Sequence, residues 1–149
     1  MPELYEVLLI DGAARWHAGW LVDDETETDL LLTDAQRRVL LFGSRAALEH
    51  HAQEHHLELH DDLPDEIDLD LGGWLSAGSP PPDLAEITEL WHLLYDDPVA
   101  GRALASEEIG EAYDDLVEEV DGWFAAHGSL ARAALKDAVQ RLRKASRTV

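Results

Sequence analysis

The chain has 149 residues, no cysteine, and 32 Asp and Glu against 11 Lys and Arg, which gives a net charge of −21. The absence of cysteine excludes disulfides, thiolate metal sites and cysteine nucleophiles, and it favours a reducing compartment. So acidic a chain repels nucleic acid and anionic membranes, and we expect neither DNA, nor RNA, nor a membrane among its partners.

Residues 1–78 are predicted to form a small antiparallel sheet with one helix. The apolar run Leu4–Ile10 ends at the turn pair Asp11-Gly12, and Arg15–Val22 then alternates, as in a half-buried strand. The acidic stretch Asp23–Asp29 is predicted to be a loop. Two further short strands are predicted at Leu30–Leu32 and Val39–Phe42.

The period of the apolar residues changes after these strands. Ser44 is a good N-cap for a helix of about three turns that ends near His56. Glu66–Leu71 alternates again, with its carboxylates on one face, and is predicted to be a strand that Gly72-Gly73 ends.

The sharpest break in the chain is the proline-rich run at 79–82, which we interpret as a linker within one domain. Residues 83–149 are predicted to be a helical half, with a last helix that ends near Ala145. Helices begin after Asp83, Ser106 and Ser129, and Gly128 ends the long helix that Ser106 begins. Strands followed by helices predict an α+β fold.

The charges are unevenly distributed along the chain. Residues 1–128 hold 5 Lys and Arg against 31 Asp and Glu, whereas 129–149 hold six basic residues and Asp137 alone. The helix after Ser106 carries eight carboxylates and no basic residue, and like charges three or four residues apart destabilise a helix. We therefore expect Arg132, Lys136 and Arg143 of the last helix to act as internal counter-charges.

Five histidines lie between His50 and His60. His51 and His55 are four residues apart and share a helix face, and His60 is close enough in sequence to complete a site for a divalent metal. The intervening residues lack the Glu of a zincin motif. A metal-binding protein or metal-dependent enzyme is therefore one hypothesis, with structural or pH-responsive histidines as alternatives.

No catalytic or phosphate-binding motif is present, so our first hypothesis is a non-enzymatic, cytoplasmic bacterial module that binds a basic protein. Small acidic immunity or antitoxin-like inhibitors of nucleases illustrate this physics. Two sets of carboxylates are the candidate contacts, namely Glu66, Asp68 and Asp70, and Asp114, Asp115, Glu118 and Glu119. A further alternative is a soluble protein whose acidity serves only solvation, as in a salt-adapted cell.

Overall fold

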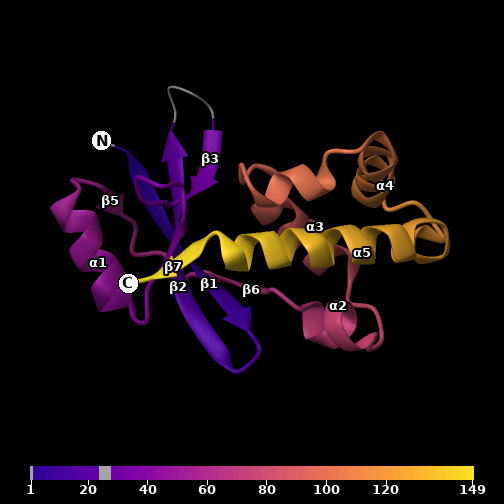
Figure 1. The fold of residues 1–149 in the computed structure, drawn as a ribbon, viewed down its shortest axis with the longest axis horizontal. Helices are drawn as coiled ribbons and strands as arrows, with labels where there is room; N and C mark the ends of the chain where they lie inside the picture. The colour runs from indigo at the N-terminus through magenta and orange to yellow at the C-terminus, as the bar shows by residue number, and fades with distance from the viewer. Residues whose placement is uncertain (1, 24–27) are drawn as a thin grey trace. The chain divides into compact units, whose positions relative to one another are not determined.

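The computed structural model describes residues 2–23 and 28–149, so the middle of the predicted acidic loop, residues 24–27, lies outside the described residues. The fold is α+β, as predicted, with strands gathered in the N-terminal half and helices in the C-terminal half (Figure 1). The chain forms two compact units, residues 1–69 with 145–149, and residues 70–144. The proline-rich run at 79–82 lies inside the second unit.

The first unit is organised around a long antiparallel hairpin. Strand β1 (Glu3–Asp11) pairs with β2 (Ala14–Asp23) along its whole length. The turn between them contains Gly12 at φ 63°, a conformation that glycine adopts without strain. Strand β3 (Thr28–Leu31) adds to β2 in the antiparallel direction.

We predicted an antiparallel sheet, but the strands at the other edge of β1 run parallel to it. Strands β5 (Glu58–Leu59) and β6 (Asp65–Asp68) both pair with β1 in the parallel direction, so the sheet is mixed. Helix α1 (Arg45–Glu54) precedes β5 and reverses the chain, as parallel pairing of strands requires. Alternation along a strand indicates which face is buried, but not the direction of its neighbour.

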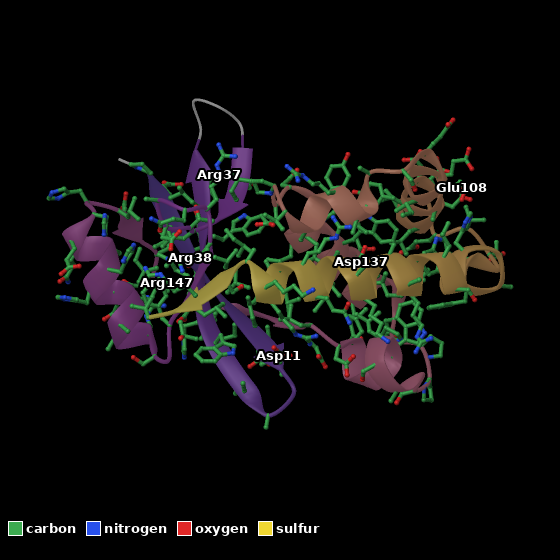
Figure 2. All side chains as sticks on the ribbon, in the orientation of Figure 1. Asp11, Arg37, Arg38, Glu108, Asp137 and Arg147 are labelled. Carbon is green, nitrogen blue, oxygen red and sulfur yellow. The ribbon has the colours of Figure 1, made fainter. Side chains whose placement is uncertain are left out.

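The last residues also depart from the prediction. Strand β7 (Ser146–Thr148), which we did not predict, pairs in parallel with β4 (Val39–Leu41) in the first unit. The last helix ends at Lys144, next to its predicted end near Ala145. Arg147 strengthens the return of the chain to the first unit, because its Nε donates to Asp34 Oδ2 at 3.0 Å, the oxygen that Arg38 Nε also contacts at 2.9 Å (Figure 2).

The core of the first unit lies between the sheet and α1. Ser44 Oγ caps α1 by accepting from Ala47 N at 3.2 Å, as the sequence predicts. Gly19 packs so closely that an added Cβ would lie 2.7 Å from Leu4 Cδ1. The buried cluster comprises Leu4, Leu32, Leu40, Phe42, Leu48 and Ala52.

The second unit is helical. Its elements are the 3₁₀ turn η1 (Leu71–Gly73), α2 (Trp74–Ala77), α3 (Leu84–Tyr95), the 3₁₀ turn η2 (Ala100–Leu104), α4 (Glu107–Val117) and α5 (Trp123–Lys144). Ser106 caps α4 as predicted, its Oγ accepting from Ile109 N at 3.3 Å. Asp83 precedes α3 but makes no side-chain cap hydrogen bond.

The break between α4 and α5 lies elsewhere than the sequence suggests. We predicted one helix from Ser106 to Gly128, but α4 ends at Val117 and α5 runs through Gly128 without interruption. The chain turns through Glu119 and Gly122, whose φ values are 53° and 76°. This turn places Trp123 in the core, where its Nε1 donates to Ala112 O at 2.8 Å.

No helix in the described part of the chain is both long and apolar enough to cross a membrane.

Candidate functional site

Helix α4 presents a strongly acidic outer face. Its apolar residues Ile109, Ala112 and Leu116 are buried. The exposed carboxylates on α4 and the turn after it form what we call the α4 acidic face, and Glu108 extends outward from the helix (Figure 2). They are Glu107, Glu108, Glu111, Asp114, Glu118, Glu119 and Asp121.

Asp115, one of the predicted contact residues, has a different role from its neighbours because it pairs with a histidine of α5. Its Oδ2 lies 2.7 Å from His127 Nε2 on α5, and its side chain is half-buried. The pair links α4 to α5 inside the second unit. Asp114, Glu118 and Glu119 are exposed and belong to the α4 acidic face, and their role as partner contacts stays a prediction.

The ion pairs that we expected between the basic residues of α5 and the α4 acidic face are not found in the described part of the chain. Arg132 Nε donates to Trp74 O at 2.6 Å and its second nitrogen to Leu75 O at 3.1 Å. Arg141 pairs with Asp137 one turn back on its own helix. Among residues 2–23 and 28–149, no arginine or lysine forms an ion pair with a carboxylate of α4. The α4 acidic face therefore lacks an arginine or lysine ion pair among the described residues.

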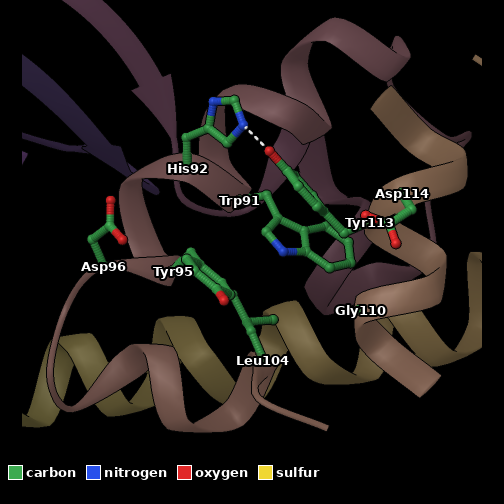
Figure 3. A pocket seen from close by; sticks show the side chains of 8 residues that line it. All are labelled: Trp91, His92, Tyr95, Asp96, Leu104, Gly110, Tyr113 and Asp114. Carbon is green, nitrogen blue, oxygen red and sulfur yellow. Dashed lines mark hydrogen bonds between the residues drawn. The ribbon is translucent and has the colours of Figure 1, made fainter. Parts of the chain in front are cut away.

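A hollow of about 390 Å³ adjoins the acidic face (Figure 3). Its walls come from the end of α3, from η2 and from the middle of α4. The lining residues are Trp91, His92, Tyr95, Asp96, Leu104, Gly110, Tyr113 and Asp114. Asp114 belongs to both the hollow and the α4 acidic face.

Aromatic rings form the walls of the hollow. The rings of Tyr95 and Tyr113 are nearly parallel, at 11°, with centroids 6.5 Å apart. His92 Nε2 and the Tyr113 hydroxyl share a hydrogen bond of 2.6 Å, which fixes the second ring. Trp91 is 1% exposed and lies against Tyr113 with centroids 5.6 Å apart.

The second predicted set of carboxylates is divided between the two units. Glu66 forms an ion pair with Arg15, and Asp68 is half-buried in β6. Asp70 belongs to the second unit, where its two oxygens accept from Ser76 N at 2.9 Å and Ser76 Oγ at 2.6 Å. Glu66 and Asp70 therefore have structural partners within their own units.

The predicted metal ligands are only partly brought together. His51 and His55 stack with centroids 4.2 Å apart, whereas His60 stacks on Tyr5 at 4.2 Å. Burial lowers the pKa of His51, and the neighbouring His55 lowers it further. In the described residues, no three His, Asp or Glu side chains are grouped closely enough to hold a metal ion.

The first unit also contains a buried charge cluster that the sequence did not predict. The Glu6 side chain is 3% exposed, and its oxygens lie 2.5 Å from His17 Nδ1 and 3.1 Å from Arg45. Partial burial lowers the pKa of Arg45, but hydrogen bonds with Glu6 and Glu49 more than offset this and raise it. The one available signal was a single Glu inside an apolar strand, which predicts a buried partner.

The tyrosine-lined hollow was also missed. Tyr95 and Tyr113 lie on different helices, and at helical spacing each is as compatible with the core as with a binding site.

No known protein family profile matches the chain, and no curated protein matches it. Among solved structures, the chain is similar to the crystal structure of the SatS C-terminal domain in complex with bromine. The TM-score is 0.60 over 98% of this chain and 94% of that chain, at 15% sequence identity. At this identity the likeness shows a common fold.

Proposed function

We propose that the chain is a non-enzymatic interaction module that binds a basic protein through the α4 acidic face. The observation that supports this proposal is the absence of any arginine or lysine ion pair to α4 within residues 2–23 and 28–149. Like charges at this spacing destabilise a helix by a few tenths of a kcal/mol per pair. A basic partner would relieve that repulsion on binding.

Charge also restricts the class of partner. A net charge of −21 steers basic proteins toward the surface and opposes the approach of DNA, RNA and anionic membranes. Carboxylates on one helix can occupy the sites at which a nuclease binds the phosphates of its substrate, as an immunity or antitoxin-like inhibitor would. The absence of cysteine fits a reducing compartment such as the bacterial cytoplasm.

The test uses two variants with the same change in net charge. Glu111→Gln, Glu118→Gln and Glu119→Gln together reduce the α4 acidic face without touching the hollow. Glu54→Gln, Glu58→Gln and Asp62→Asn together remove three exposed carboxylates from the first unit and serve as the control.

The full chain and both variants are immobilised and exposed to a lysate of the source cells at low salt. We expect one basic protein to bind the wild type and the control, to elute as salt reduces the Debye length below about 10 Å, and to be lost from the α4 variant. A partner retained equally by all three proteins, or no retained protein, would overturn the proposal.

A further inference from the structure

We infer that the hollow between Tyr95 and Tyr113 is a binding slot for the guanidinium group of an arginine side chain. Figure 3 shows both tyrosine rings among the residues that line the hollow, with the Trp91 ring between them in this view, and the planes of the two tyrosine rings are nearly parallel. The identification of its natural occupant as an arginine of a basic protein rests on the proposed function. The geometry of the slot is independent of it.

The separation of the rings selects a flat group. The centroids are 6.5 Å apart and the planes 11° from parallel, so the ring planes are separated by at most 6.5 Å. One planar layer stacked on both rings needs about 3.5 Å on each side, so binding requires the exposed Tyr95 ring to move outward.

The electrostatics of the slot select a cation. The faces of the two tyrosine rings are negative and attract a positive group. Asp96 and Asp114 also line the hollow, and within residues 2–23 and 28–149 no lysine or arginine lines it. A phosphate-bearing ligand would be repelled by the same carboxylates.

Arginine fits these two conditions better than lysine. Guanidinium is planar and weakly hydrated and stacks on aromatic faces, whereas ammonium is compact and strongly hydrated. Asp96 and Asp114 line the hollow, and carboxylates accept charge-assisted hydrogen bonds from guanidinium N–H groups.

Helix α4 contains a feature that keeps the slot open. Gly110 lies inside α4 and lines the hollow, and a Cβ added to it would meet nothing within 4 Å. A helix with glycine in its interior is less stable than the same helix with alanine there, by about 0.5–1 kcal/mol. Packing therefore does not require a glycine at position 110. A long side chain there would fill the hollow.

Three variants test the slot in the full chain. Tyr95→Ala removes one wall, and because Tyr95 is 57% exposed its removal leaves the core intact. Tyr95→Phe keeps the ring and is the matched control. Gly110→Met keeps both rings and fills the space between them.

The probes are N-acetyl-arginine amide, N-acetyl-lysine amide and adenosine, titrated while backbone amide shifts around the hollow are recorded by NMR. We expect the arginine compound to bind best. Tyr95→Ala should weaken its binding about threefold to thirtyfold, the range of a cation–π contact, with Gly110→Met similar and Tyr95→Phe within about twofold of wild type.

Unchanged affinity in Tyr95→Ala, or tighter binding of adenosine than of the arginine compound, would overturn the inference. Its failure differs from a failure of the proposed function. A basic protein that needs the α4 acidic face but binds Tyr95→Ala normally supports the function and overturns the slot. Arginine binding at the hollow without a retained basic protein supports the slot and overturns the proposed function.

Discussion

Arg132 on α5 donates from Nε to the backbone oxygen of Trp74 at 2.6 Å. Its second nitrogen reaches Leu75 O at 3.1 Å, so one half-buried guanidinium satisfies two carbonyl groups of the four-residue helix α2. A residue we expected to serve as a counter-charge for α4 instead holds α2 within the second unit.

Replacing Arg132 should therefore destabilise the fold. Hydrogen bonds from a charged donor contribute about 1.5–3 kcal/mol, and we expect Arg132→Ala to lower the free energy of unfolding by about that amount. Arg132→Lys should recover little, because an ammonium group cannot reproduce the planar fork. Urea unfolding measures both changes, and the exposed Lys136→Ala, within about 0.5 kcal/mol of wild type, is the control. Equal stability of all three variants would contradict this role.

The Glu6–Arg45 pair gives a second prediction. Removing one partner of a buried ion pair leaves the other charge uncompensated, which costs about 3–5 kcal/mol when both are buried. Arg45 is 29% exposed, so we expect Arg45→Met to destabilise by about 2–4 kcal/mol.

Glu49 supplies the matched comparison, because it pairs with the same guanidinium from an exposed position, 3.0 Å away on α1. Glu49→Gln should change stability by at most about 1 kcal/mol. If chemical denaturation ranks Glu49→Gln as equal to Arg45→Met, the buried pair does not organise the first unit.

His51 predicts a pH dependence. Its folded-state pKa is lowered, first by burial and then by His55, so the unfolded chain binds the proton more readily than the folded chain. Stability should therefore fall as the pH drops from about 7 through the lowered folded pKa, because protonation then favours the unfolded state.

His51→Phe keeps a ring against Phe42 and removes the titrating group. We expect this variant to have a flatter dependence of melting temperature on pH below about 7 than wild type. His50→Gln, on the exposed side of α1 beside Glu54, should keep the wild-type slope. A His51→Phe slope identical to wild type would refute the assignment.

Local patterns predicted much of this fold. The β1–β2 hairpin follows from alternation around Asp11-Gly12, and Ser44 and Ser106 cap helices because a hydroxyl at that position satisfies a nearby amide. Each of these signals lies within a few residues of the structure it predicts.

The errors come from interactions between distant residues. Glycine at position 128 looked like a helix stop, but it is buried inside α5. Helix α4 ends at Val117 instead, just before Glu119, a residue type that gives no warning of a positive φ. Tyr95 and Tyr113 meet only because the turn after Asp97 brings α3 and α4 together through η2. Nothing local distinguishes them from core residues.

Gly101 lies in η2 against the backbone of Tyr95, whose ring forms one wall of the slot. An added Cβ would lie 2.2 Å from Tyr95 O, so Gly101→Ala forces the backbone beside Tyr95 to move. We expect a loss of stability of about 1–3 kcal/mol and a weaker affinity for N-acetyl-arginine amide. Gly43→Ala, where nothing lies within 4 Å, is the control, and calorimetry with the NMR titration measures both effects. Wild-type affinity in Gly101→Ala would show that Tyr95 does not depend on this contact.

The α4 acidic face yields a prediction about salt. Glu111 has like charges three or four residues away on both sides, including Glu107 and Asp114. The α4 variant with Gln at 111, 118 and 119 should therefore be more stable than wild type by about 0.5–1 kcal/mol at low salt. The difference should vanish near 1 M salt, where the Debye length is about 3 Å.

The control with Gln at 54 and 58 and Asn at 62 should gain less, because Glu54 lies 3.0 Å from His50 and loses a partner on substitution. Thermal unfolding across a salt series compares the three proteins. If both variants gain equally and wild-type stability rises steeply into molar salt, the repulsion is spread over the whole surface, which favours acidity for solvation. A gain confined to the α4 variant means that this helix retains charges that reduce its own stability, as expected of a surface kept for a basic partner.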